Sequence, residues 1–290
     1  MFVIIGYIVV FGCVFGGFAI AGGHLGSLFQ PVELLMIGGA GLGAFLVSNT
    51  GNTVKATLKG FGTCFKGSKF NKALYLELIL LLYGILSKIR AEGMIAIEKD
   101  VDNPEESEVF KKYPLILGDH HIIEFITDYM RLMVSGNMDP FQIENLMDNE
   151  IETHHHEALI PAHTIAKIAD GLPAFGIVAA VMGVVHTMES VGLPPAELGI
   201  LIANALVGTF LGILLAYGVV GPLSTLLENK TEEEAKVYQC IKVTLLASLN
   251  GYPPSIAVEF GRKVLYSTER PSFTDLEAEI KASKSRAKAE

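Results

Sequence analysis

The sequence of 290 residues lacks tryptophan and has only three cysteines, Cys13, Cys64 and Cys240. Three widely separated cysteines predict neither a disulfide framework nor a zinc site. The sequence also lacks the glycine-rich phosphate-binding motifs, the paired-cysteine motif and the nucleophile-elbow motif. These absences argue against an enzyme and against a resident cofactor.

Basic residues are missing from two long blocks of the sequence. Residues 1–54 contain no Lys or Arg and a single acidic residue, Glu33, and residues 168–229 also contain no Lys or Arg. Half of the chain is hydrophobic, and only 18% is charged. The net charge of −9 argues against general binding to nucleic acid. This pattern predicts an integral membrane protein with a large water-facing part.

The two apolar blocks each divide into two predicted membrane spans. About 20 apolar helical residues are needed to cross a hydrocarbon core about 30 Å thick. The predicted spans are 2–21, 32–49, 170–189 and 198–221. The short loops at 23–31 and 190–197 have no Lys or Arg, whereas the segments after the second and fourth spans are rich in Lys. The positive-inside rule therefore predicts a periplasmic N-terminus and a cytoplasmic location for 50–167 and 222–290.

The water-facing segments have the periodicity of helices. Residues 70–92, 121–134 and 140–156 carry apolar side chains at helical spacing, and no segment is rich in strand-forming residues. The predicted fold class is an all-α membrane protein with four transmembrane helices and a large helical cytoplasmic domain. The predicted domains are, in order, 1–50 with spans one and two, 51–167 in the cytoplasm, 168–223 with spans three and four, and a cytoplasmic helical tail at 224–290.

The predicted spans have few groups that can carry a charge across a membrane. Asp170, Glu189 and Glu33 are expected near span ends, and the polar groups expected near mid-span are Asn204 and Thr209. Transporters and channels that work alone usually have a charged group near the middle of the bilayer. If this protein moves ions, we therefore expect a partner to supply the titrating carboxylate.

Spans three and four contain small residues at helical spacing, and one proline lies inside span three and another at the inner end of span four. The small residues are Gly176, Ala180 and Gly183 in span three, and Gly208, Gly212 and Ala216 in span four. Such rows let helices approach closely, either within the chain or against other subunits. Pro173 and Pro222 are expected to free a backbone carbonyl and to kink their helices.

The conspicuous polar residues outside the spans have ordinary interpretations. His154–His156 cannot all bind one metal ion, because adjacent helical residues point about 100° apart. We therefore predict a solvated helix face. Arg90 and Glu98 flank Gly93 and are expected to be exposed charges, which matter only where a complementary charged surface meets them.

Three segments carry a specific resemblance to a known family. They are DGLPAFGIVAAVMGVVHTM (170–188), VGTFLGILLAYGVVGPL (207–223) and SLNGYPPSIAVEFGRKVLYSTERPSF (248–273). Together with the span count, they resemble the flagellar motor stator family of MotA and PomA. The resemblance implies an inner-membrane ring of this chain, with five copies around a dimer of MotB, which supplies the ion-binding aspartate. It also implies that ion flow generates torque on the rotor protein FliG.

The resemblance also implies roles for single residues. The implied rotor contacts are Arg90, Glu98 and Glu150. The residues implied in the ion pathway and its coupling to movement are Pro173, Thr209, Pro222, Ala180 and Tyr217. The sequence is most similar to the proton-driven branch, which makes H⁺ the predicted ion, although a threonine hydroxyl is compatible with Na⁺ as well.

Two alternatives stay open at this point. One is an energiser of another envelope process like TolQ and ExbB, which would not need the rotor-facing charges. The other is a membrane scaffold without ion flow, for which Thr209→Val and Pro173→Ala would leave function intact.

Overall fold

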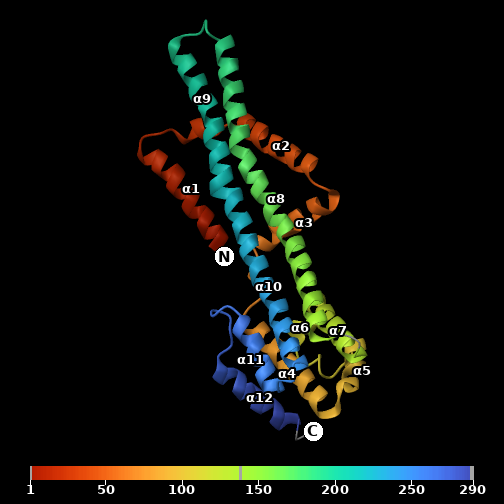
Figure 1. Ribbon diagram of the computed structural model, residues 1–290. Coiled ribbons are helices and arrows are strands. Elements are labelled where there is room, and N and C mark those ends of the chain that lie inside the picture. The colour runs from red at the N-terminus through yellow and green to blue at the C-terminus, as the bar shows by residue number, and fades with distance from the viewer. Residues whose placement is uncertain (1, 137–138, 288–290) are drawn as a thin grey trace. The chain divides into compact units, whose positions relative to one another are not determined.

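The computed structural model describes residues 2–136 and 139–287, where the regular secondary structure is helical (Figure 1). The chain divides into two compact units. The membrane unit comprises Met1–Gly67 and Ala158–Lys230, and the head unit comprises Ser68–Glu157 and Thr231–Glu290. The four predicted domains are divided at the points where the chain is expected to enter or leave the membrane. The two units are instead groups of residues that pack on one another.

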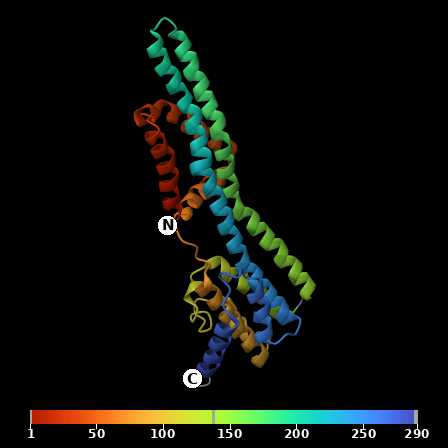
Figure 2. The same cartoon turned by 90° about the vertical axis from the view of Figure 1, so that its left-hand side faces the viewer.

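The membrane unit contains all four predicted spans. Among the described residues, four helices are long and apolar enough to cross a membrane, which confirms the predicted fold class. Figures 1 and 2 both show α8 and α9 lying side by side and joined by a short turn. The elements of this unit are α1 (Phe2–Ile20), η1 (Leu25–Leu28), α2 (Pro31–Ser48), α3 (Gly51–Cys64), the later part of α8 (Pro140–Glu189), α9 (Pro195–Ile213), η3 (Leu214–Val220) and the first residues of α10 (Gly221–Leu249).

A local cap and a distant basic side chain set the two ends of α3. The hydroxyl of Thr50 accepts a hydrogen bond from the backbone N–H of Thr53 at 3.3 Å, which satisfies one free donor of the first turn. At the other end, the Lys230 ammonium donates to the carbonyl oxygens of Thr63 and Lys66 at 2.6 and 2.7 Å. A cation at a helix C-terminus is favourable, because the last carbonyls have no partners within the helix.

The head unit is built around α4 (Lys72–Glu92). Nine residues of α4 are buried, so this helix is covered on several sides. Asn71 caps its first turn, and Gly93 ends it with a φ of +88°. Each fully buried Leu or Ile in this core contributes about 1.5–3 kcal/mol of apolar burial. The other elements are η2 (Met94–Ile97), α5 (Glu98–Asp102), α6 (Pro114–Leu117), α7 (His120–Ser135), the first part of α8, the later part of α10, α11 (Pro254–Val264) and α12 (Phe273–Ala287).

The sequence predicts separate helices at 140–156 and 170–189, but the structure has a single helix, α8, of 50 residues. Asp139 starts it, because its Oδ1 accepts a hydrogen bond from the backbone N–H of Gln142, while the Oε1 of Gln142 accepts one from the backbone N–H of Asp139. Pro161 and Pro173 lie inside the helix. Each proline removes only one N–H donor, and the alanine-rich and apolar residues between them maintain the helix.

Candidate functional site

The residues predicted to line an ion path come from the paired helices α8 and α9. Ala180 on α8 is only 8% exposed, and its backbone nitrogen lies 3.1 Å from where a β-carbon on Gly208 would be. Thr209 follows Gly208 on α9 and is half-buried. The structure therefore brings Ala180 and Thr209 to one level of the helix pair. Tyr217 lies apart from them, about two turns further along, and is 67% exposed.

Glycines let α8 and α9 pack backbone against backbone. A β-carbon on Gly176 would lie 2.7 Å from the carbonyl oxygen of Gly208. A β-carbon on Gly212 would lie 2.8 Å from the carbonyl oxygen of Leu172. Both distances are too short for a real carbon, so these positions need glycine. The predicted small-residue rows are therefore used, at these positions, for packing within the chain.

Glu33 occupies a place that the sequence does not predict. As predicted, it lies at the start of a span, in the first turn of α2, and the sequence does not reveal that the residue is only 8% exposed. Its carboxyl group faces Gly183 on α8 and Gly208 on α9, where added β-carbons would lie 3.5 Å from Oε1 and 2.8 Å from Oε2. The one sequence signal for it was its position as the sole acid in residues 1–54.

The two predicted coupling prolines lie on different helices. Pro173 is half-buried inside α8, and Pro222 is exposed in the first turn of α10. Directly before Pro222, η3 is a π-helical segment, which sequence periodicity does not reveal. The Tyr7 hydroxyl of α1 donates to the carbonyl oxygen of Val219 in this segment at 3.0 Å. π-helical turns are frequent at functional sites, and this one adjoins a predicted coupling residue.

Arg90 and Glu98 are both exposed on the head unit. Arg90 is in the last turn of α4, and Glu98 is the first residue of α5. Within the residues that the structure describes, neither side chain forms an ion pair or a hydrogen bond. Both charges are therefore available to an external partner.

The segment that carries Glu98 is held in place by two basic side chains. Lys88 of α4 pairs with Asp100 at 2.7 Å. Arg131 of α7 donates to Asp102 at 3.2 Å and to the carbonyl oxygen of Val101 at 3.0 Å. These residues position Glu98 but were not predicted from the sequence, because the partners are far apart along the chain.

Glu150, the third predicted rotor contact, has an internal partner. Although the residue is exposed, its Oε2 accepts a hydrogen bond from the Tyr129 hydroxyl at 2.7 Å. Burial, with the hydrogen bond to Glu150 as the next cause, raises the pKa of Tyr129 above its ordinary value. Tyr129 therefore stays protonated at physiological pH and links α7 to α8.

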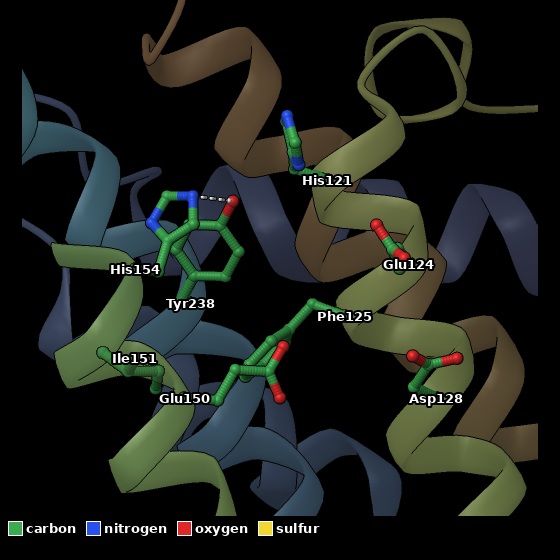
Figure 3. Close-up of a pocket in the computed structure, with 8 residues that line it drawn as sticks. All are labelled: His121, Glu124, Phe125, Asp128, Glu150, Ile151, His154 and Tyr238. Atoms are coloured by element: carbon green, nitrogen blue, oxygen red, sulfur yellow. Dashed lines mark hydrogen bonds between the residues drawn. The ribbon is translucent and has the colours of Figure 1, made fainter. Parts of the chain in front are cut away.

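A polar hollow of about 110 Å³ lies beside Glu150 (Figure 3). The ring of His154 packs 4.7 Å from that of Tyr238, and its Nε2 lies 3.4 Å from the Tyr238 hydroxyl. Of the run predicted to form a solvated face, His156 is exposed but His154 is half-buried. Among the described residues, no group of three or more potential ligands is arranged to hold a metal ion. The lining residues are His121, Glu124, Phe125, Asp128, Glu150, Ile151, His154 and Tyr238.

Solved structures with similar folds are stator complexes. The chain superposes on a chain of a structure described as C. jejuni MotAB with a TM-score of 0.76 and 20% identity, covering 93% of this chain and 98% of that one. The flagellar MotAB stator complex from Bacillus subtilis gives a TM-score of 0.71 and 23% identity, covering 88% and 92%. At these identities the similarity establishes the fold.

Sequence comparisons establish the family. Residues 4–93 match the family described as Motility protein A N-terminal, and residues 119–240 match the MotA/TolQ/ExbB proton channel family. Motility protein A of Salmonella typhimurium is 57% identical over 282 residues, covering 97% of this chain and 96% of that protein. Motility protein A of Escherichia coli is 57% identical over 284 residues, covering 98% and 96%.

A more distant relative, chemotaxis protein LafT of Vibrio parahaemolyticus, is 36% identical over 273 residues and covers 94% of this chain and 96% of that protein. The resemblance noted from the sequence is thereby confirmed, as is the prediction of a channel protein rather than an enzyme. The chain belongs to the motility protein A family of flagellar stator proteins, within the MotA/TolQ/ExbB proton channel family.

Proposed function

We propose that this chain forms, with a MotB-type partner, a proton channel of the flagellar motor that generates torque on the rotor protein FliG. The observation that carries the proposal is the α8–α9 pair. Its glycines pack the two helices on each other, yet Ile177, Val181 and Leu206 on the pair remain exposed. Such a pair has further apolar faces that fit the membrane helices of a partner and of neighbouring copies. We infer a ring of five copies around two MotB chains.

The physical mechanism begins with the charge on the partner's aspartate. Binding a proton neutralises that aspartate, which lowers the cost of placing it against an apolar surface. Release of the proton restores the charge on the aspartate. The charged aspartate then favours contact with a more polar face of this chain. The Thr209 hydroxyl offers a polar contact beside this path. A proton that crosses about 150 mV supplies roughly 3.5 kcal/mol, well above RT.

Coupling to the rotor uses the prolines and the exposed charges. Pro173, Pro222 and the adjoining π-helical segment provide places where the helices can bend. Arg90 and Glu98 then meet complementary charges on FliG, through an electrostatic contact that salt weakens. The chain lies in the inner membrane with its N-terminus in the periplasm and its head unit in the cytoplasm.

The first test is swimming of a bacterium that lacks its own stator genes and receives this chain with its MotB-type partner. Swimming that requires both chains and does not depend on sodium supports the proposal. Swimming only with sodium contradicts the choice of ion, and no swimming at normal membrane levels of both chains contradicts the stator function.

Matched variants test the assigned residues. We expect Thr209→Val, which preserves shape but removes the hydroxyl, to reduce proton flow, whereas Thr153→Val on the exposed face of the head unit should not. Arg90→Ala combined with Glu98→Gln should reduce torque. The control, Lys112→Ala with Glu105→Gln, changes exposed charges elsewhere on the head unit. Equal torque in both double variants contradicts the rotor contact.

A further inference from the structure

Glu33 is an acidic side chain enclosed by apolar and backbone groups of the membrane unit. The residue is 8% exposed, and within the described residues its buried Oε2 has no hydrogen-bond partner. The carboxyl group lies where Gly183 of α8 and Gly208 of α9 leave room for it. A β-carbon on Gly208 would lie only 2.8 Å from Oε2, so a side chain there would displace the carboxyl group.

The surroundings offer no charge that would stabilise an ionised carboxylate. On α8 the β-carbon of Ala179 also faces Gly208, and Ala205 of α9 packs against Gly183. No other acidic or basic residue occurs in α2. The titratable residues of the two facing helices, within the membrane unit, are His163, Lys167, Asp170, His186 and Glu189 on α8 and Glu197 on α9, and each is exposed.

An ionised carboxylate in this position would be costly. A buried charge without a donor or counter-ion costs several kcal/mol, and the usual response of such a group is to bind a proton and become neutral. A protonated carboxyl group has the same shape and fits the same space. The packing seen in the structure is therefore the packing of the neutral acid.

Release of the proton must change the packing of α2. The ionised group needs a hydrogen-bond donor at Oε2, and the described residues provide none between Gly183 and Gly208 while α2 rests on α8 and α9. Proton release at Glu33 is thus linked to separation of α2 from the helix pair. Proton binding at Glu33 and the movement of α2 therefore take place beside Thr209, because the carboxyl group of Glu33 faces Gly208, which directly precedes Thr209.

We propose that Glu33 is a proton-binding residue on the proton route of this chain, neutral when α2 is packed on α8 and α9 and ionised when that contact opens. The proposal rests on the proposed function as a proton channel. In the uptake step a proton from water forms the O–H bond of the carboxyl group. In the release step that bond breaks, and the proton passes to water on the exit side.

The first experiment detects the bound proton without requiring any flux. The full chain is purified with its MotB-type partner, and the infrared absorption of protonated carboxyl groups is recorded at neutral pH. We expect the wild-type complex to show an absorption that Glu33→Gln lacks and that Glu197→Gln retains. Glu197 is the matched control, because it is an exposed acid on α9. Identical spectra for all three complexes would overturn the proposal.

The second experiment measures proton flow in cells that make the chain and its partner, as the fall in internal pH after external acid is added. We expect Glu33→Gln to reduce the flow by about ten-fold or more, and Glu197→Gln to leave it unchanged. We expect Glu33→Asp to retain part of the flow, with its dependence on external pH displaced, which a purely structural residue would not cause. Flow in Glu33→Gln equal to that of the wild type would overturn the proposal.

Two outcomes separate this proposal from the channel function on which it rests. If the wild-type pair passes no protons, the channel function fails, and the infrared comparison still decides whether Glu33 holds a proton. If Glu33→Gln does not reach normal membrane levels, Glu33→Asp decides. An unchanged pH dependence of proton flow in Glu33→Asp would then overturn the role of Glu33.

Discussion

A single methyl group at Gly176 tests whether the contact between α8 and α9 is essential. In Gly176→Ala the new β-carbon would lie 2.7 Å from the carbonyl oxygen of Gly208 and 3.0 Å from the α-carbon of Gly212. Both are backbone atoms and cannot rotate away. Ordinary contact begins at 3.4 Å, so the helices must part by about 0.7 Å at this point.

The energetic cost follows from that displacement. Inserting a methyl group into a well-packed interface costs about 1–3 kcal/mol. A gap of this size also forfeits about a quarter to a half of the dispersion energy between facing atoms. Because Ala180 and Thr209 lie on the same helix pair, we expect stator function to fall together with stability.

The assay is unfolding of the purified full chain with its partner by increasing detergent denaturant, followed by helical circular dichroism. Swimming speed is measured in parallel. Gly43→Ala on α2 is the control, because its β-carbon would meet nothing within 4 Å. If Gly176→Ala and Gly43→Ala are equally stable and equally motile, the argument from close packing is wrong.

Three further predictions concern the head unit. Tyr129→Phe keeps the ring but removes the hydrogen bond to Glu150, and should lower the free energy of unfolding of the head unit by about 1–2 kcal/mol, measured by thermal unfolding of the complex. Gly93→Ala places a β-carbon on a backbone with φ of +88°, at a cost of about 1–2 kcal/mol, and should reduce the torque of tethered cells without lowering membrane levels. Burial raises the pKa of Tyr75, Tyr129 and Tyr238 above their ordinary value of 10.0, so the stabilisation they give is complete below that pH and is lost as the pH rises further. Phenolate absorbance should therefore rise together with alkaline unfolding, and half-complete ionisation of these three tyrosines in a head unit that is still folded at pH 10.0 would contradict this reasoning.

Much of the fold was predictable because membrane spans leave a strong signal in sequence. The absence of basic residues and the long apolar runs located all four spans, and helical periodicity identified α4 and α7. The continuity of α8 was not predictable, because Pro161 and Pro173 normally indicate a helix end. Tertiary packing and strong helix formers between them outweigh that local preference.

The site was less predictable, because its geometry depends on which faces of α8 and α9 meet. The sequence identified Thr209 and Ala180 through a family resemblance, and the structure shows that Ala180 faces Gly208 rather than open space. The start of an apolar run correctly indicates that Glu33 lies at a span end, but it does not indicate that the side chain is buried. Burial against two glycines from distant parts of the chain leaves no local pattern.

The π-helical segment η3 affects the direction in which the side chains of the following helix, α10, point. A single π turn holds one more residue than an α turn, and one residue corresponds to about 100° of rotation. Leu223 and Leu227 are buried on the helix that follows the segment, where they belong to one apolar cluster. A natural or engineered deletion of one residue within Leu214–Val220 would therefore act as a rotation of the following helix rather than as a shortening, and would turn both leucines out of the core.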